Sequence, residues 1–318
     1  APSPRANVPS RGYAARDTTG VLSRWSFNRR AVGDDDVLID IKYCGICHSD
    51  IHQLRGEWGT QQYPQVPGHE ITGIVAAVGR NVTRFKVGDQ AGAGTMLDSC
   101  LACDSCRRGE EQYCDNDATL FAYGAPDRRE PTGITQGGYA TNVVVKEHFA
   151  INIPTTIRLQ DAAPLLCAGV TTYFPLVRNE IRTGHKVGVA GIGGLGHLAV
   201  KLARARGAEV YAFTTSPSKV EDIRRFGAQE VIVVDTLDKL RGPHAGTLDY
   251  MISTIPVDYD IGAYAALVKP YGTYTQVGMP AAGRITMNTF AFNDSRAKVD
   301  TSLVGGIPLT QQLVDYCA

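Results

Sequence analysis

The segment KVGVAGIGGLG, residues 186–196, places a short apolar run directly before spaced glycines, and the amphipathic segment 195–207 follows. This order predicts a strand, a glycine-rich turn and a helix whose first N–H groups bind the pyrophosphate of a dinucleotide. We expect Gly191 to form the turn, Gly193 to admit the phosphates and Gly196 to let the helix pack closely. The alternative is a turn that binds nothing. The predicted cofactor loop is Gly191, Ile192, Gly193, Gly194, Leu195 and Gly196.

Strand-like and helix-like segments alternate from residue 186 onward. Helical patterns at 195–207 and 218–227 separate the first strand candidates. The six candidates are residues 187–191, 209–215, 230–235, 248–254, 272–278 and 299–305. This alternation predicts a parallel, doubly wound α/β sheet.

The N-terminal half has a different pattern. Short β-like runs separated by glycine occupy residues 37–44, 71–79, 87–94 and 137–145. They predict a glycine-rich barrel or sandwich. Residues 161–178, DAAPLLCAGVTTYFPLVR, predict the first long helix, which would connect the two parts.

The preference for NAD or NADP is usually indicated at the end of the second strand of a dinucleotide-binding sheet, where a carboxylate binds the ribose 2′-hydroxyl of NAD. No carboxylate stands there in this chain, and hydroxyls and a cation suit a 2′-phosphate, which favours NADP(H). Lys219 could instead be a solvated helix charge. The residues in question are Thr214, Thr215, Ser216 and Lys219.

Four cysteines, Cys100, Cys103, Cys106 and Cys114, lie close together in a polar, turn-rich segment. Four thiolates at such spacing suit one tetrahedral zinc ion of the structural kind. An iron–sulfur cluster also uses four thiolates, and disulfides are a further alternative. Six of the eight cysteines lie between Cys44 and Cys114, which favours metal binding in a reducing compartment.

A second candidate metal site combines Cys47, His69 and Cys167. Two thiolates and an imidazole can hold zinc and leave a fourth position for a substrate oxygen, as in catalytic sites. Taken alone, Cys167 in an apolar segment could equally be a small core residue.

Composition narrows the class of protein. The chain has 318 residues and 43% hydrophobic content, enough for the cores of two domains. Thirty-two basic residues balance 32 acidic ones, which gives no indication of a nucleic-acid or membrane partner and favours a small ligand. With no apolar run of signal-peptide or membrane-span type, we expect a soluble, cytoplasmic protein.

Several specific motifs occur together. Residues 44–52 read CGICHSDIH, residues 164–169 read PLLCAG, and residues 191–197 read GIGGLGH. Between them lie the four cysteines and the pattern Gly68-His69-Glu70-x2-Gly73-x5-Gly79-x2-Val82. In this order they resemble the zinc-type medium-chain dehydrogenases/reductases, specifically the cinnamyl alcohol dehydrogenase branch and its bacterial aldehyde-reductase relatives. The resemblance runs from about residue 37 to the last residue.

The resemblance implies a domain organisation. Residues 1–154 would form a GroES-like zinc-binding catalytic domain and residues 155–305 an NADP-binding Rossmann domain, with 306–318 starting a segment that returns to the catalytic domain. A homodimer is implied. Family members continue a few tens of residues further and use that tail to complete the catalytic domain, so stability, dimer formation and activity would depend on it.

The resemblance also implies residue roles. Cys47, His69 and Cys167 would bind the catalytic zinc, with Glu70 as an alternative or exchanging ligand. A further set would assist: Asp50 would orient His69, Ser49 and His52 would relay the proton, and Trp58 and Met96 would line the substrate pocket. For Trp58 and Met96, plain core packing is an equal alternative.

These inferences define a function hypothesis. The chain is expected to be an oxidoreductase with two zinc ions, one catalytic and one structural, that transfers hydride between NADP(H) and a primary alcohol or aldehyde, with reduction of aromatic or medium-chain aldehydes as the favoured reaction. One alternative is an NAD-dependent polyol or formaldehyde dehydrogenase. Another is a non-catalytic relative that binds zinc and nucleotide.

Overall fold

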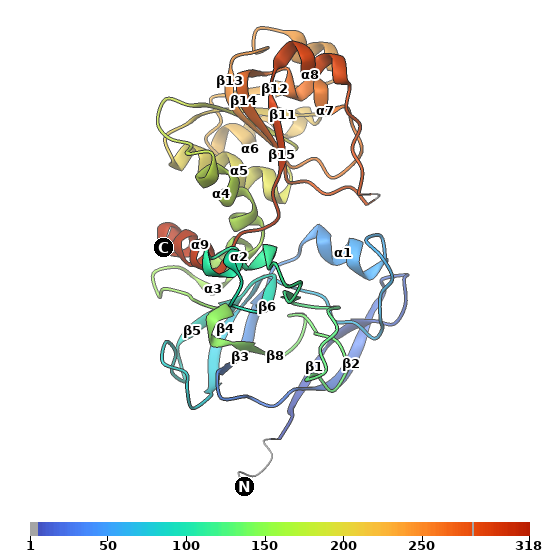
Figure 1. Cartoon of the computed structure of the whole chain (residues 1–318), viewed down its shortest axis with the longest axis vertical. Coiled ribbons are helices and arrows are strands. Elements are labelled where there is room, and N and C mark those ends of the chain that lie inside the picture. The colour runs from blue at the N-terminus through green and yellow to red at the C-terminus, as the bar shows by residue number, and fades with distance from the viewer. Residues whose placement is uncertain (1–5, 282) are drawn as a thin grey trace. The chain divides into compact units, whose positions relative to one another are not determined.

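Two units make up the chain in a computed structural model that describes residues 6–281 and 283–318 (Figure 1). The first unit comprises Ala1–Val170 and Gly305–Ala318, and the second comprises Thr171–Val304. The domain boundary predicted after residue 154 separates a catalytic domain from a cofactor domain, which is a division by function and not by compactness. It stays a prediction. Within the described residues, no helix combines the length and apolar character needed to cross a membrane.

Antiparallel strands form the framework of the first unit. A five-stranded sheet has the order β8-β3-β4-β5-β9, and two separate two-stranded sheets pair β1 with β2 and β6 with β7. The strands are β1 (Val8–Ala15), β2 (Leu22–Arg29), β3 (Asp36–Cys44), β4 (Ile71–Val78), β5 (Gln90–Ala93), β6 (Met96–Asp98), β7 (Leu120–Phe121), β8 (Asn142–Lys146) and β9 (Ala150–Asn152). This confirms the predicted β-rich part of the fold. The β1–β2 hairpin was not predicted from the sequence.

Short helices connect these strands. The α-helices are α1 (His48–Leu54), α2 (Asp104–Arg107), α3 (Leu159–Ala162) and α9 (Ile307–Cys317). Three 3-10 helices are η1 (Glu111–Tyr113), η2 (Glu147–Phe149) and η3 (Ala163–Leu166). Helices α1, η1, η3 and α9 belong to this unit.

The predicted continuous helix at 161–178 is wrong. The chain forms α3, then η3, then leaves helical geometry at Cys167, with φ −130° and ψ −78°, before α4 (Ala168–Arg178) begins. Pro164 has no backbone N–H and cannot continue the hydrogen bonding of α3. The interruption frees Cys167 from a helical position, and its sulfur lies beside Cys47 and His69.

The second unit is built on a six-stranded parallel sheet with the order β12-β11-β10-β13-β14-β15. The strands are β10 (Lys186–Ala190), β11 (Glu209–Thr214), β12 (Glu230–Val233), β13 (Leu248–Ser253), β14 (Val268–Gln276) and β15 (Lys298–Thr301). The helices are α5 (Gly194–Ala205), α6 (Val220–Arg225), α7 (Ile261–Ala265) and α8 (Thr289–Ser295), with η4 (Pro217–Lys219) and η5 (Leu237–Arg241). Strand order reverses between β10 and β13, where doubly wound sheets bind ligands. The predicted α/β Rossmann sheet is confirmed.

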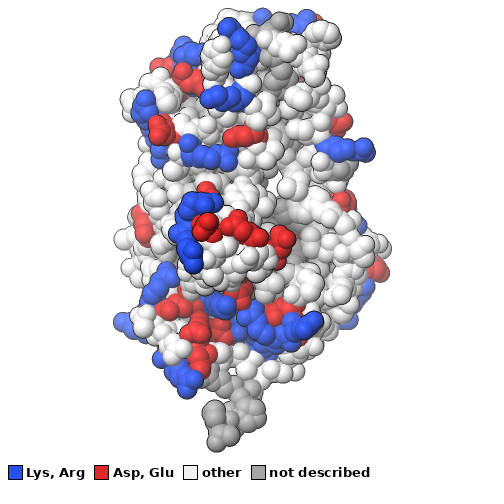
Figure 2. All heavy atoms as spheres, in the orientation of Figure 1, with Lys and Arg blue, Asp and Glu red and all other residues white. Residues whose placement is uncertain are grey.

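Acidic and basic side chains are interspersed on the face drawn in Figure 2. This distribution agrees with the equal numbers of both charges in the sequence. On that face, no large region carries charge of one sign alone.

Candidate zinc and dinucleotide sites

One buried cluster brings together Cys47, His69, Glu70 and Cys167, whose ligand atoms all lie within 4.8 Å of one another. The sulfurs of Cys47 and Cys167 are 3.9 Å apart, and Nε2 of His69 lies 3.1 Å from Cys167 Sγ. A tetrahedral zinc ion with Zn–S bonds of about 2.3 Å separates two sulfurs by about 3.8 Å. The donor set and its spacing therefore fit one zinc ion.

Three elements far apart in sequence position these ligands. Cys47 is the N-cap residue of α1, His69 and Glu70 directly precede β4, and Cys167 occupies the break between η3 and α4. Because Cys167 contacts the other two, it is not simply a core residue. The structure thus gathers all four residues predicted for this site.

Proton sharing links the two sulfurs. Cys167 donates a hydrogen bond to Cys47 and so lowers the pKa of Cys47 to about 4, while the same contact and burial raise the pKa of Cys167 well above its ordinary value. A cation that binds both sulfurs displaces this proton, since only thiolates are metal ligands. The cluster is therefore chemically suited to exchange a proton for a metal ion.

Asp50 holds the imidazole of His69 from behind. Its Oδ1 lies 3.2 Å from Nδ1 of His69 and accepts a hydrogen bond from the Gly68 N–H at 3.0 Å. Its Oδ2 accepts from the Cys47 N–H at 3.0 Å. Burial alone would raise the pKa of Asp50, but these hydrogen bonds, led by that from His69, keep it below its ordinary value. An ionised Asp50 leaves Nε2 of His69 free to face the metal position.

Two tyrosines that the sequence analysis missed complete this arrangement. The Tyr139 hydroxyl donates to Asp50 Oδ2 at 2.9 Å, and the Tyr123 hydroxyl lies 3.1 Å from Nδ1 of His69 and also hydrogen-bonds Asp50. Neither tyrosine is near Asp50 in the sequence. No local pattern could have identified them.

Glu70 is the fourth member of the cluster. Its carboxylate accepts a hydrogen bond from the backbone N–H of Ala168, the residue after Cys167. Burial raises the pKa of Glu70 to about 7, and the positive charge on His69 offsets part of that effect. A carboxylate with this pKa is poised between its neutral and charged forms near neutral pH.

The predicted proton-relay residues lie on α1. Ser49 hydrogen-bonds the Cys47 sulfur. His52 donates from Nδ1 to the Glu57 carboxylate, which the sequence analysis missed, and its buried Nε2 has no hydrogen-bond partner among the described residues. This bond to Glu57 selects the tautomer with an accepting Nε2.

The two predicted pocket residues differ in their surroundings. Trp58 is 36% exposed, and its ring lies 4.9 Å from that of His52, centroid to centroid. Met96 is only 2% exposed and sits on β6, paired with Phe121 of β7. Their predicted contact with substrate stays a prediction.

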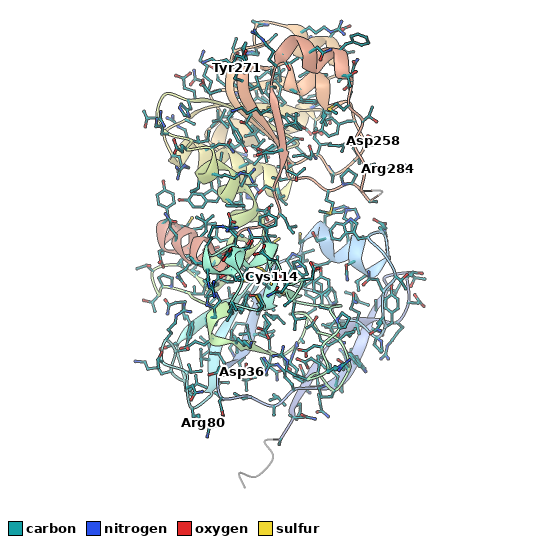
Figure 3. The ribbon with its side chains drawn as sticks, in the orientation of Figure 1. Asp36, Arg80, Cys114, Asp258, Tyr271 and Arg284 are labelled. Carbon is teal, nitrogen blue, oxygen red and sulfur yellow. The ribbon has the colours of Figure 1, made fainter. Side chains whose placement is uncertain are left out.

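The second cluster is the four-cysteine lobe, which we define as residues 100–114; Figure 3 labels its last ligand, Cys114. Two sulfur pairs, Cys100 with Cys106 and Cys103 with Cys114, are each 3.9 Å apart. These separations exceed the roughly 2.05 Å of a disulfide and match a tetrahedral zinc site. An iron–sulfur cluster places several irons and sulfides between its thiolates and so needs a wider spacing.

Backbone geometry supports thiolates in this lobe. The N–H groups of Ala102 and Cys103 both point at Cys100 Sγ at 3.4 Å, and the Asp115 N–H points at Cys103 Sγ at 3.3 Å. Such N–H contacts stabilise negative charge on sulfur. The contacts from Ala102 and Cys103 lower the pKa of Cys100 to about 6.

The glycine loop has the geometry that its sequence predicts. Gly191 has a φ of +79°, which only glycine adopts readily, and a Cβ on Gly196 would lie 2.0 Å from the Gly191 carbonyl oxygen. A Cβ on Gly193 or Gly194 would meet no heavy atom within 4 Å. The start of α5 therefore has open space where a pyrophosphate would lie.

Lys219 reaches this loop. Its Nζ donates to the carbonyl oxygen of Ile192 at 3.0 Å. At the end of β11, the Thr214 hydroxyl accepts from the Ser216 N–H at 3.1 Å, while the side chain of Thr215 is exposed. A cation, hydroxyls and the loop thus occupy the place where NAD-binding sheets carry a carboxylate.

Comparisons with known proteins identify the family of the chain. The family model for the alcohol dehydrogenase GroES-like domain matches residues 33–155, and that for zinc-binding dehydrogenases matches residues 194–318. The chain belongs to the zinc-dependent medium-chain alcohol dehydrogenase family, with a GroES-like domain and a Rossmann domain.

Within this family the chain is close to the cinnamyl alcohol dehydrogenases and bacterial aldehyde reductases. It is 45% identical to NADP-dependent alcohol dehydrogenase C 1 of Mycolicibacterium smegmatis, over 96% of this chain and 86% of the relative. It is 43% identical to aldehyde reductase YahK of Escherichia coli, over 93% and 84%. The structure of CAD from Helicobacter pylori complexed with NADP(H) superimposes with a TM-score of 0.91 at 41% identity, over 98% of this chain and 88% of the other.

Proposed function

We propose that this alcohol dehydrogenase reduces aromatic or medium-chain aldehydes to primary alcohols with NADPH. The observation that carries the proposal is the convergence of Cys47, His69 and Cys167 around one point. Relatives named as NADP-dependent alcohol dehydrogenase and aldehyde reductase support the choice of reaction and cofactor.

The metal ligands divide into two kinds. Cys47, His69 and Cys167 would hold the zinc, and Glu70 would be the carboxylate that gives way to substrate. When bound, zinc in such a site polarises a carbonyl oxygen as a Lewis acid. Asp50 keeps the His69 ring in the orientation that this coordination needs.

Proton transfer is proposed for the α1 residues. Ser49 lies beside Cys47, and His52, held by Glu57, presents a buried Nε2 that has no hydrogen-bond partner in the described part of the chain. An imidazole is suited to this task because its unperturbed pKa lies near 6.5. Trp58, which packs on His52, is proposed to contact the substrate, and Met96 to support that wall.

NADPH would bind through the loop from Gly191 to Gly196. We propose that Lys219, Thr215 and Ser216 contact the 2′-phosphate, with Thr214 holding the turn through its bond to Ser216. The reduced nicotinamide supplies the hydride when bound.

A substrate panel tests the proposal directly. Initial rates with aromatic, medium-chain and short aldehydes should be higher with NADPH than with NADH, and cinnamaldehyde-like substrates should give the highest kcat/KM. Faster turnover of formaldehyde or a polyol with NAD⁺ would overturn it in favour of the alternative dehydrogenase.

Assembly and location are part of the same proposal. A homodimer is proposed because β15 is the terminal strand of the six-stranded sheet among the described residues, and a terminal strand can pair with that of a second copy. Light scattering on the purified chain tests the dimer. All eight cysteines are free of disulfides, which supports a reducing, cytoplasmic location.

A further inference from the structure

Glu111 is a charged residue inside the four-cysteine lobe that does not face the sulfurs. It is 0% exposed and lies on η1, between Cys106 and Cys114. Its Oε2 accepts a hydrogen bond from the backbone N–H of Ile307 at 2.9 Å, across 196 residues of sequence. Its Oε1 lies 2.7 Å from Nε2 of His148. The lobe therefore holds a buried carboxylate against the start of α9.

This carboxylate substitutes for a missing helix cap. The N-cap residue of α9 is Gly306, which has no side chain to bind the free N–H groups of the first turn. A carboxylate at this position is stabilised by the helix dipole and satisfies one of those groups. Glu111 thus does for α9 what a local Ser or Asp does elsewhere.

The backbones of the lobe and of α9 also touch directly. A Cβ on Gly306 would lie 1.6 Å from the carbonyl oxygen of Gly109, and a Cβ on Gly109 would lie 2.9 Å from Pro308. Figure 1 shows α9 beside α2, in agreement with these contacts. The start of α9 therefore cannot keep its place if the lobe moves.

The rest of α9 supports the segment that carries Cys167. Leu313 is fully buried, and a Cβ on Gly169 would meet Leu313 Cδ2 at 3.1 Å and Leu165 at 3.2 Å. Gln311 pairs with both backbone groups of Asn152, at 2.8 and 2.9 Å, which fixes the position of the helix along β9. Residues 165–169 thus rest against α9, with Cys167 in their middle.

We propose that Glu111 is a positioning residue that couples the two metal sites through α9. With an ion bound, the lobe presents Glu111 and Gly109 to the start of α9, and α9 in turn supports Cys167 at the catalytic cluster. Without that ion, four closely spaced thiolates repel one another, the lobe loosens and the cap is lost. The metal of the lobe would therefore maintain the affinity of the other site, beyond stabilising its own loop. This inference rests on the two zinc sites and not on the proposed substrate.

Glu111→Gln tests the coupling, because it keeps the shape and removes the charge. The matched control is Glu110→Gln, whose half-buried carboxylate forms an ion pair with Arg108 at 3.5 Å. Cobalt placed in the catalytic site reports its coordination by visible absorption, and chelator competition reports its affinity. Zinc retained by the lobe is counted separately, and hydrogen exchange follows the amides of α9.

We expect Glu111→Gln to keep the lobe zinc, to speed exchange at the start of α9 and to weaken cobalt binding at the catalytic site about 3- to 10-fold, with a changed absorption spectrum. Glu110→Gln should change none of these. Faster α9 exchange with unchanged cobalt affinity and spectrum would overturn the coupling. Equal loss of metal from both sites would also overturn it, by making Glu111 a general support of the fold.

Leu313→Ala breaks the same path at its other end and keeps the proposal testable if Glu111→Gln folds poorly. It should weaken cobalt binding and leave the lobe zinc and the Glu111 cap intact. In the double variant the two losses should be less than additive, since both interrupt one path. Full additivity would contradict a shared path. All of these readouts are independent of aldehyde reduction.

Discussion

Oδ1 of Asp50 lies 3.2 Å from Nδ1 of His69, on the opposite side of the ring from Cys167 Sγ, which lies 3.1 Å from Nε2. The carboxylate and the metal position thus use different nitrogens of one imidazole. Because the backbone N–H groups of Cys47 and Gly68 also bind Asp50, the same carboxylate aligns two ligand-bearing segments. Asp50 therefore holds the ligands of the catalytic site in place from the side opposite the metal position.

Asp50→Asn should weaken catalytic zinc binding about 10- to 100-fold, as loss of such metal-site partners typically does. The amide keeps the shape but not the charge that orients His69. Affinity is measured by chelator competition, with Asp40→Asn, at an exposed position of β3, as control. Equal affinities in the Asp50 variant and the parent would contradict the assigned orientation.

Tyr123→Phe should also weaken zinc binding at the catalytic site, but by less than Asp50→Asn. The lost hydroxyl leaves Asp50 and His69 with one hydrogen bond fewer, a change of about 1 kcal/mol in metal affinity. The visible spectrum of the cobalt-substituted enzyme and its metal affinity are the measurements. Tyr13→Phe, at an exposed position, should match the parent.

Lys219→Ala should raise the KM for NADPH about 10- to 100-fold and leave the KM for NADH nearly unchanged. The expectation follows from a charge-assisted hydrogen bond to phosphate, worth about 1.5–3 kcal/mol. Steady-state kinetics with both cofactors is the measurement, and Lys201→Ala on α5 is the control. An equal rise in the KM values for NADPH and NADH would mean that Lys219 supports the loop through its bond to Ile192 and does not contact the 2′-phosphate.

Cys103→Ser should remove one of two zinc ions per chain. Three thiolates hold zinc less firmly than four, and structural zinc sites contribute directly to folding free energy. Metal analysis should fall from about two ions to one, with a lower Tm. If both ions remained, the lobe would not be the structural site.

Lowering the pH should reduce the free energy of unfolding more in the unchanged protein than in the Glu111→Gln variant. Burial raises the pKa of Glu111, but His148 and the Ile307 N–H lower it by more, so it lies below its ordinary value in the folded chain. Its contribution to stability is complete above the unfolded pKa, about 4.3, and is lost as pH falls through the folded pKa. Denaturant unfolding between pH 7 and pH 3 should therefore show a steeper loss in the parent. Parallel curves would contradict this contribution.

Local sequence patterns were sufficient to predict much of the fold and part of the candidate sites. The tight turn of the glycine loop at 191–196 and the clustering of the four cysteines at 100–114 could be predicted because each is made by neighbours in the chain, whose spacing alone brings the atoms together. Likewise the alternation of strands and helices after residue 186 predicted the parallel sheet, since burial on both faces of a strand leaves a continuous apolar run.

Only the tertiary structure decided the rest. The break at Cys167 places its sulfur next to Cys47 and His69, because packing across the fold, and not the order of the chain, sets which residues meet. Tyr123 and Tyr139 meet Asp50 for the same reason. Glu111 caps Ile307 from 196 residues away, and no sequence period relates them. The sequence alone thus determined which chemical groups the sites contain. Which of these groups contact one another was decided by packing, because packing brings together residues that lie far apart in the chain.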